Sequence, residues 1–184
     1  TYLFGKGDGQ DLITGWTYDT TAGKLNTLQF KAGVLPSEVT IRQVYDNYWG
    51  GNRALEFSIA GTTDKVTVSG FFAYDDPGNA YNPLQQVKFD DGTTWDLRDI
   101  RATLLTGSMN NDLITGWVGA DVLQGADGND TLTDTSGSAL FNGGAGADTI
   151  TGGASAEIFL GGLGNDTYTT AGGNDIILFN KGDG

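Results

Sequence analysis

Acidic residues recur every nine positions in the C-terminal part of this sequence, at a spacing that could build metal sites. Eight consecutive nine-residue units run from Gly107 to Leu178 without a slip. Seven of the eight keep a carboxylate at the sixth position, and all eight keep a bulky apolar residue at the eighth. The pattern is G-G-x-G-x-D-x-U-x, with U a large apolar residue, and it is typical of stacked β-helix repeats. The chemistry it offers is oxygen coordination of a cation by carboxylates and backbone carbonyls.

Residues 18 positions apart become neighbours if two units make one turn of such a helix, because its parallel strands stack about 4.8 Å apart. The turn loops then form two columns. Carboxylates stacked about 5 Å apart repel one another unless a cation lies between them. Column one contains the carboxylates of Asp112, Asp130, Asp148 and Asp166.

An all-oxygen set of six or more flexible ligands favours Ca²⁺ over Mg²⁺. Each gap, meaning the space between two consecutive loops of column one, offers two carboxylates and the carbonyls of both loops. We expect odd-position carbonyls of the adjacent loop to complete each coordination shell. The expected even-position carbonyl ligands belong to Asn110, Ala126, Gly128, Gly144, Gly146, Gly162 and Gly164.

Column two is less regular than column one. It contains Asp121, Ala139, Glu157 and Asp175, with candidate carbonyls at Gly119 and Gly173. Ala139 lacks a ligand, its unit opens with Asp134-Thr135 instead of Gly-Gly, and Glu157 is one methylene longer than Asp. We expect three full sites in column one and one or two weakened sites in column two, hence about three to five Ca²⁺ ions. Substitution of Glu157 should therefore matter less than substitution of Asp148. If the Asp residues only capped turns, the strict period would be unexplained.

Charge supports a cation-dependent fold. The net charge is -13, and ten acids against one Lys give residues 107–184 a charge of -9, whereas residues 17–106 carry only -3. Such an acidic segment is expected to stay unfolded without cations, and it argues against nucleic acid or an anionic membrane as a partner. The absence of Cys and His excludes disulfides, thiol chemistry and the commonest general base. No signal peptide or apolar run predicts a membrane-spanning segment.

The repeat itself predicts the elements that position these loops. The glycine-rich first six residues allow left-handed turn conformations, and the last three form a short strand with U pointing inward. One sheet is expected to bury Ile114, Leu132, Ile150 and Tyr168. The other is expected to bury Leu123, Phe141, Phe159 and Ile177.

The whole sequence predicts an all-β protein: a calcium-binding parallel β-roll with a small inserted antiparallel β domain. The strings 11–16 and 112–117 are identical, so residues 1–16 are expected to start the roll, 17–106 to form the insertion, and 107–184 to continue the roll. Asp11 is a candidate for a further site on Asp112, although the register across the insertion is open. Alternation predicts strands at 39–42, 55–59, 66–68 and 87–89, and a hairpin at Asp91-Gly92. No stretch has helical periodicity.

The ends of the sequence resemble each other. Residues 1–9 and 176–184 share six of nine residues at an offset of 175, which predicts one module of a tandem array in a longer protein, with neighbouring copies as partners. A duplicated local motif without tandem copies is the alternative. The aromatics Tyr48, Trp49 and Tyr74 could form a stacking platform for a sugar or a protein, although a small sheet more often uses such residues in its core.

Together these motifs resemble those of the RTX (haemolysin-type calcium-binding) proteins. Residues 107–178 match the family's nonapeptide, and residues 27–100 look like the haemolysin-type calcium-binding-related domain. The resemblance implies a bacterial protein that is exported by type I secretion, unfolded at low cytosolic Ca²⁺ and folded outside the cell, either secreted or at the cell surface.

Two functions are consistent with the sequence. The first is a non-catalytic, calcium-folded structural or spacer module of a large secreted protein. The alternative is a ligand-binding or adhesion module whose inserted domain recognises a carbohydrate or protein. An enzyme, for instance a glycosidase with paired carboxylates, is not expected, because the carboxylates are committed to turns and His and Cys are absent.

Overall fold

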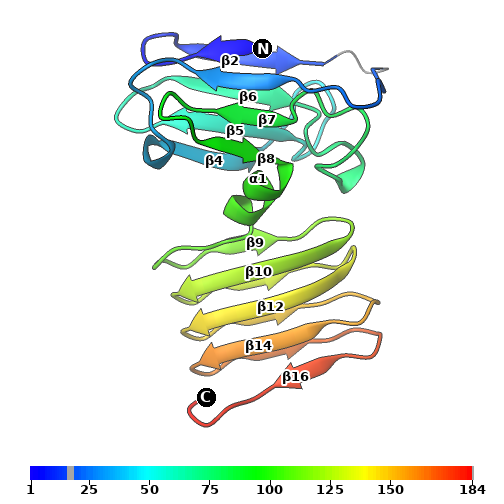
Figure 1. Cartoon of the computed structure of the whole chain (residues 1–184). Coiled ribbons are helices and arrows are strands. Elements are labelled where there is room, and N and C mark those ends of the chain that lie inside the picture. The colour runs from blue at the N-terminus through cyan, green and yellow to red at the C-terminus, as the bar shows by residue number, and fades with distance from the viewer. Residues whose placement is uncertain (16–18, 184) are drawn as a thin grey trace. The chain divides into compact units, whose positions relative to one another are not determined.

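The structure, a computed structural model of the 184-residue chain, describes residues 1–15 and 19–183. The chain divides into two compact units, Thr1–Arg101 and Ala102–Gly184. Strands dominate both units (Figure 1). Among the described residues, no helix combines the length and the apolar character needed to cross a membrane.

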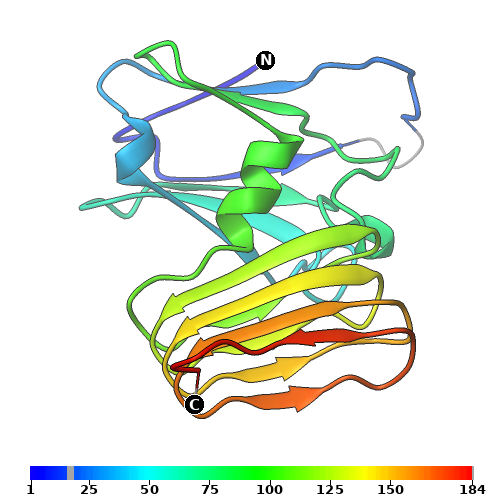
Figure 2. The same ribbon diagram turned by 60° about the horizontal axis from the view of Figure 1, so that its bottom comes forward.

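The C-terminal unit is the predicted parallel β-roll (Figure 2). Its strands form two parallel four-stranded sheets in which partners are 18 residues apart, as between Leu132 and Ile150. One sheet contains β9 (Leu113–Thr115), β11 (Thr131–Thr133), β13 (Thr149–Thr151) and β15 (Thr167–Thr169). The other contains β10 (Ala120–Asp127), β12 (Ser138–Ala145), β14 (Ile158–Leu163) and β16 (Ile176–Leu178).

The eighth residue is buried in the roll in six of the eight units, as the repeat predicts, whereas Tyr168 is half-buried and the prediction is wrong for Ile177. Leu132, Ile150, Phe141 and Phe159 are fully buried, and the rings of Phe141 and Phe159 stack with centroids 5.1 Å apart. Ile177, in the last strand β16, is about half exposed. The apolar column thus holds the two sheets together and fixes the register of the loops between them.

Three strands of the roll, β10, β12 and β14, are longer than the expected three residues. β10 and β12 each have eight residues, because their ladder continues from the strand into the next loop, where Ala126 pairs with Gly144. Positive φ angles then alternate along these loops, for example 80° at Ala126 and 113° at Gly128. This backbone, which glycine adopts without strain, directs alternate carbonyls towards the adjacent loop.

The N-terminal unit contains two four-stranded sheets. The first sheet has the order β1 (Tyr2–Phe4), β3 (Thr27–Phe30), β7 (Gln86–Lys88) and β8 (Thr94–Asp96). The second has the order β2 (Gln10–Thr14), β6 (Lys65–Ser69), β5 (Ala54–Ile59) and β4 (Val39–Val44). Phe30 from the first sheet contacts Phe57 from the second at 6.3 Å between ring centroids, so the two sheets share a core.

The four strands predicted in the insertion are present, and β7 and β8 form the predicted hairpin. The sheets, however, are mixed and not purely antiparallel: β1 and β7 each pair with β3 in parallel, and β2 pairs with β6 in parallel. Crossovers between the sheets bring sequence-distant strands together, which alternation within one strand cannot predict.

The structure also corrects the assignment of residues 1–16 to the roll. β1 and β2 belong to the sheets of the N-terminal unit, and Asp11 lies exposed in β2, paired with Val66. The shared string Asp-Leu-Ile-Thr forms a strand in both places, but a strand's partner depends on residues far away in sequence. Trp16 and the expected boundary between residues 16 and 17 lie outside the described residues.

One α-helix was not predicted: α1 (Leu97–Leu104). Asp96 precedes it and accepts hydrogen bonds from the backbone N–H groups of Arg98 (2.8 Å) and Asp99 (3.1 Å), while Asp99 accepts one from the Asp96 N–H (2.8 Å). This reciprocal capping stabilises the first turn, and Ile100 is buried. Eight residues are too few to show a clear apolar period in the sequence. The spacing of Asp96 and Asp99 is nevertheless typical of the start of a helix.

Candidate metal site

The column-one carboxylates bridge consecutive loops of the roll. In each step the backbone N–H of one Asp donates to Oδ1 of the Asp 18 residues later. The distances are 2.8 Å for Asp112 to Asp130, 2.8 Å for Asp130 to Asp148 and 3.0 Å for Asp148 to Asp166. The structure therefore brings the four predicted aspartates into one row, as the 18-residue register requires.

The second carboxylate oxygen has a different environment. Oδ2 of Asp130 and Oδ2 of Asp148 are buried without a hydrogen-bond partner. A Cβ built on Gly125 would overlap both Asp130 Oδ2 and the Gly143 carbonyl oxygen. Two oxygens from adjacent loops thus converge beside Gly125, and the same holds beside Gly107 and Gly143. Buried acceptors that converge without donors are what a cation site offers.

The even-position carbonyls project into the same gaps. A Cβ on Gly144 would overlap the Ala126 carbonyl oxygen, and a Cβ on Gly146 would overlap that of Gly128. The Asn110 oxygen lies 2.5 Å from a Cβ position on Gly128. The same relation joins Gly144 to Gly162 and Gly146 to Gly164. Carboxylate and carbonyl oxygens from two loops therefore surround each gap, a donor set that fits Ca²⁺.

No cluster of three or more side-chain ligands occurs within residues 1–15 and 19–183. Backbone carbonyls must therefore supply much of any coordination shell. Burial raises the pKa of Asp148, and the negative charges of Asp166 and Asp130 raise it further. The carboxylates of the row therefore repel one another. Lys181 is the single basic residue after position 107, so the segment itself offers little positive charge to neutralise the column.

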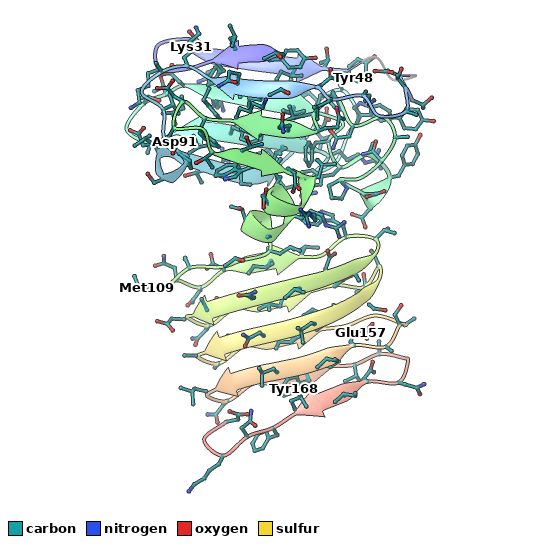
Figure 3. The ribbon with its side chains drawn as sticks, in the orientation of Figure 1. Lys31, Tyr48, Asp91, Met109, Glu157 and Tyr168 are labelled. Carbon is teal, nitrogen blue, oxygen red and sulfur yellow. The ribbon has the colours of Figure 1, made fainter. Side chains whose placement is uncertain are left out.

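Column two also forms a row, with different contacts. Trp117 N–H donates to Asp121 Oδ2 at 2.7 Å, and Glu157 N–H donates to Asp175 Oδ1 at 3.1 Å. The Glu157 side chain lies in the turn before β14 (Figure 3), 1% exposed, and neither of its oxygens has a hydrogen-bond partner. Burial, and then the charge of Asp175, raise the pKa of Glu157.

The two carbonyl candidates of column two occupy equivalent fourth positions, with φ of 115° at Gly119 and 105° at Gly173. The Gly119 oxygen would overlap a Cβ on Gly137, so it points into the next gap. At Gly173 the contact is with the preceding loop: a Cβ built there would overlap the Ser155 carbonyl oxygen. Ala139 is buried and contributes no side-chain ligand.

Sequence reasoning missed a second ladder, built by fifth-position asparagines. The N–H of Asn129 donates to Asn111 Oδ1 at 2.9 Å, and the N–H of Ala147 donates to Asn129 Oδ1 at 2.8 Å. These bonds run in the opposite direction to the Asp ladder, so neighbouring loops are tied both ways. The repeated Asn-Asp pair at positions five and six was the available signal.

Among the described residues, no ring contact joins Tyr74 to Tyr48 or Trp49. Tyr48 is exposed (Figure 3). Its ring meets that of Trp49 edge to face, with centroids 6.5 Å apart, whereas the ring of Tyr74 meets that of Tyr81 at 5.8 Å. The neighbouring Phe71 and Phe72 are fully buried and belong to the core of the unit. Tyr48 does line an open groove of about 640 Å³ over β2, β6, β5 and β4.

A methyl group at a first-position glycine should disrupt the gap. Gly143→Ala would place its Cβ against Asp148 Oδ2 and the Gly161 carbonyl oxygen, so we expect a higher calcium requirement for folding, by about tenfold or more (about 1.4 kcal/mol). Gly172→Ala is the matched control, since its Cβ would meet only Ala154 Cα at 3.7 Å. Calcium titrations monitored by circular dichroism give both midpoints, and equal midpoints would contradict this view of the gap.

Acid should favour the roll when calcium is absent. Because the folded-state pKa of Asp148 is raised, by burial first and then by Asp166 and Asp130, its ionisation opposes folding fully above that raised pKa. The opposition disappears as pH falls through the raised pKa towards the ordinary value of about 4. In calcium the trend reverses, because protons compete for the ligands. Circular dichroism against pH in calcium-free and calcium-containing buffer tests both signs; parallel curves would contradict them.

Comparisons with known proteins agree with this geometry. Residues 55–99 match the haemolysin-type calcium binding protein related domain, and residues 103–132 and 133–168 match the RTX calcium-binding nonapeptide repeat (4 copies). Over 112 residues, 61% of the chain, the sequence is 30% identical to the iron-regulated protein FrpA of Neisseria meningitidis serogroup C. The matched region spans 9% of that relative's length. The matched families are calcium-binding domains and not catalytic ones.

Proposed function

Because this chain belongs to the RTX family of haemolysin-type calcium-binding proteins, we propose that it is a non-catalytic structural module that calcium folds within a large secreted protein. The observation that carries the proposal is the row of buried Oδ2 atoms of Asp130 and Asp148 without donors. Around them lie carbonyl oxygens of the adjacent loops. When bound there, Ca²⁺ supplies the positive charge that the segment lacks.

The proposed site residues keep the roles expected for them. Carboxylates are supplied to three gaps by Asp112, Asp130, Asp148 and Asp166. The even-position carbonyls supply further oxygen ligands to the same gaps. Asp11 has no place in this set, because it lies in β2 of the other unit. The total of about three to five ions is part of the proposal.

Export outside a bacterial cell, by type I secretion, fits the same physics. A chain with ten acids and one Lys after residue 107 resists folding while calcium is scarce. It gains its fold where calcium is on the order of millimolar. The lack of Cys suits a chain that crosses unfolded and needs no disulfide. The similarity to FrpA, a far longer protein, supports a role as one part of a large protein.

Tandem stacking of such modules is a further part of the proposal. Residues 1–9 and 176–184 repeat one another in sequence. In the structure Tyr2–Phe4 is β1 and Ile176–Leu178 is β16, and both pair in parallel with a neighbouring strand. The repeated segment is therefore suited to continue a sheet at either end of a module.

Ligand binding by the N-terminal unit is the second candidate function. The observation that favours it is the open groove of about 640 Å³. Exposed Tyr45 and Tyr48 border this groove, together with Arg42 and Lys65, which both pair with Glu56. Aromatic faces beside charged groups suit a carbohydrate or a polar peptide.

The experiment that tests the leading function compares far-ultraviolet circular dichroism of the whole chain in chelator and in calcium. A calcium-folded module gains β signal on adding calcium. A chain whose spectrum does not change is not such a module.

A further inference from the structure

The unit 134–142 departs from the repeat at two positions at once. Its first residue is Asp134 where the regular units have Gly, and its sixth residue is Ala139 where they have Asp. Considered separately, the first change adds a carboxylate in an unexpected place and the second removes one from column two. The geometry of the regular units connects them.

In regular units the first and sixth positions share one space. A Cβ built on Gly125 would overlap Asp130 Oδ2, one on Gly143 would overlap Asp148 Oδ2, and one on Gly161 would overlap Asp166 Oδ2. In these units a side chain at position one would therefore displace the aspartate at position six, whereas Thr170 and Asp175 coexist in the last unit of the roll. In unit 134–142 the crowding is relieved, because a small residue stands at 139 where 134 is Asp.

Asp134 is well placed to replace the sixth-position carboxylate that Ala139 lacks. It is fully buried, and its Oδ1 accepts the N–H groups of Ser136 (3.0 Å) and Gly137 (3.2 Å). Its Oδ2 lies 2.6 Å from a Cβ position on Gly116, the first residue of the preceding column-two loop. The carboxylate therefore projects towards the preceding column-two loop, and its charge also acts on Glu157 in the following loop.

Glu157 provides an independent sign of a ligand. Its side chain is 1% exposed, and neither carboxylate oxygen has a partner at hydrogen-bonding distance, although the nearby Gly153 N–H acts to lower its pKa. The negative charges of Asp175 and Asp134 both act on it. In the same gap the Thr135 carbonyl oxygen lies 2.9 Å from a Cβ position on Gly153, as second-position carbonyls do in column one. A carboxylate that is buried beside acidic neighbours, with no donor at hydrogen-bonding distance, is stabilised by a cation.

We propose that Asp134 replaces the missing sixth-position carboxylate and, with Glu157 and the Thr135 carbonyl, binds one Ca²⁺ ion in column two. This inference rests on the proposed function, since it assigns a further ion to the same roll. It also changes the expectation from sequence: column two is altered at this point and not broken, so Glu157 should matter for calcium binding.

The test counts calcium ions bound per folded chain, by equilibrium dialysis at saturating calcium. Asp134→Asn keeps the acceptor for Ser136 and Gly137 but removes the charge, and we expect it to bind one ion fewer than the wild type. Glu157→Gln should also lose one ion, and the double variant should lose one and not two, because both residues hold the same ion. Asp127→Asn is the matched control, since Asp127 is exposed and should keep the full count.

Moving the carboxylate back is the most specific arm. Asp134→Gly should lose one ion, and adding Ala139→Asp should restore it, since the regular order of the repeat returns. A turn-capping role alone for Asp134 predicts no restoration. A full count in both Asp134→Asn and Glu157→Gln, or a failure of Ala139→Asp to restore the ion, would overturn this inference while leaving the proposed function intact. A wild-type chain that binds no calcium would overturn both.

Discussion

In chelator, residues 102–184 are expected to contribute little β signal, and calcium on the order of 10⁻⁴–10⁻³ M should bring a cooperative gain. The reason lies in the loops. Folding buries Asp130 and Asp148 in one row, each with an oxygen that has no donor. Without a cation this desolvation and repulsion oppose folding, so binding and folding are coupled. Circular dichroism over a calcium titration measures the gain.

The N-terminal unit serves as an internal reference in this experiment. Its buried Glu56 is paired with Arg42 at 2.6 Å and with Lys65 at 3.0 Å, so its acids do not depend on calcium. We expect its β signal to persist in chelator. Magnesium at the same concentration should be much less effective, because it requires a stricter octahedral shell. An identical spectrum in chelator and in roughly tenfold excess calcium would contradict the coupling.

Asp148→Ala should cause the largest shift of the calcium titration among single changes in column one. Asp148 borders two gaps, with Asp130 on one side and Asp166 on the other, and it also accepts the Asp130 N–H at 2.8 Å. Removing it takes a ligand from two sites and one ladder bond. We expect the midpoint to rise by about a hundredfold, or about 2.7 kcal/mol.

Asp127→Asn again supplies the matched control, because Asp127 is exposed at the third position of its loop. It removes the same charge without touching a gap, so its midpoint should remain within about twofold of the wild type. Asp112→Ala should lie between the two, since Asp112 borders a single gap in the roll. Equal shifts for Asp148→Ala and Asp127→Asn would mean that net charge, and not the column, controls calcium binding.

The roll could be predicted from sequence because its contacts repeat at a fixed spacing. Once Ile114, Leu132 and Ile150 recur every 18 residues, one register satisfies all of them, and the observed pairing is that register. The convergence of the column-one aspartates follows from it. The alternating φ angles at Ala126 and Gly128 follow less directly, since the sequence indicates only that small residues are needed there.

The N-terminal unit could be predicted only in part. Local alternation located β4, β5 and β6, but the partner of β2 is β6, more than 50 residues away in sequence, and no local pattern identifies it. The identity of residues 11–16 and 112–117 even favoured a wrong position for β2, next to the repeats of the roll. Likewise, Asp134 and Ala139 look like two independent defects until the space shared by positions one and six is visible in three dimensions.

The most direct test of the central claim is the position of calcium ions in crystals of this chain grown with calcium, located by anomalous scattering. We expect three ions in column one, in the gaps Asp112/Asp130, Asp130/Asp148 and Asp148/Asp166, each within about 2.3–2.6 Å of carboxylate and carbonyl oxygens from two loops. A folded roll whose column-one gaps hold no ion, with Asp130 Oδ2 and Asp148 Oδ2 still buried, would contradict it.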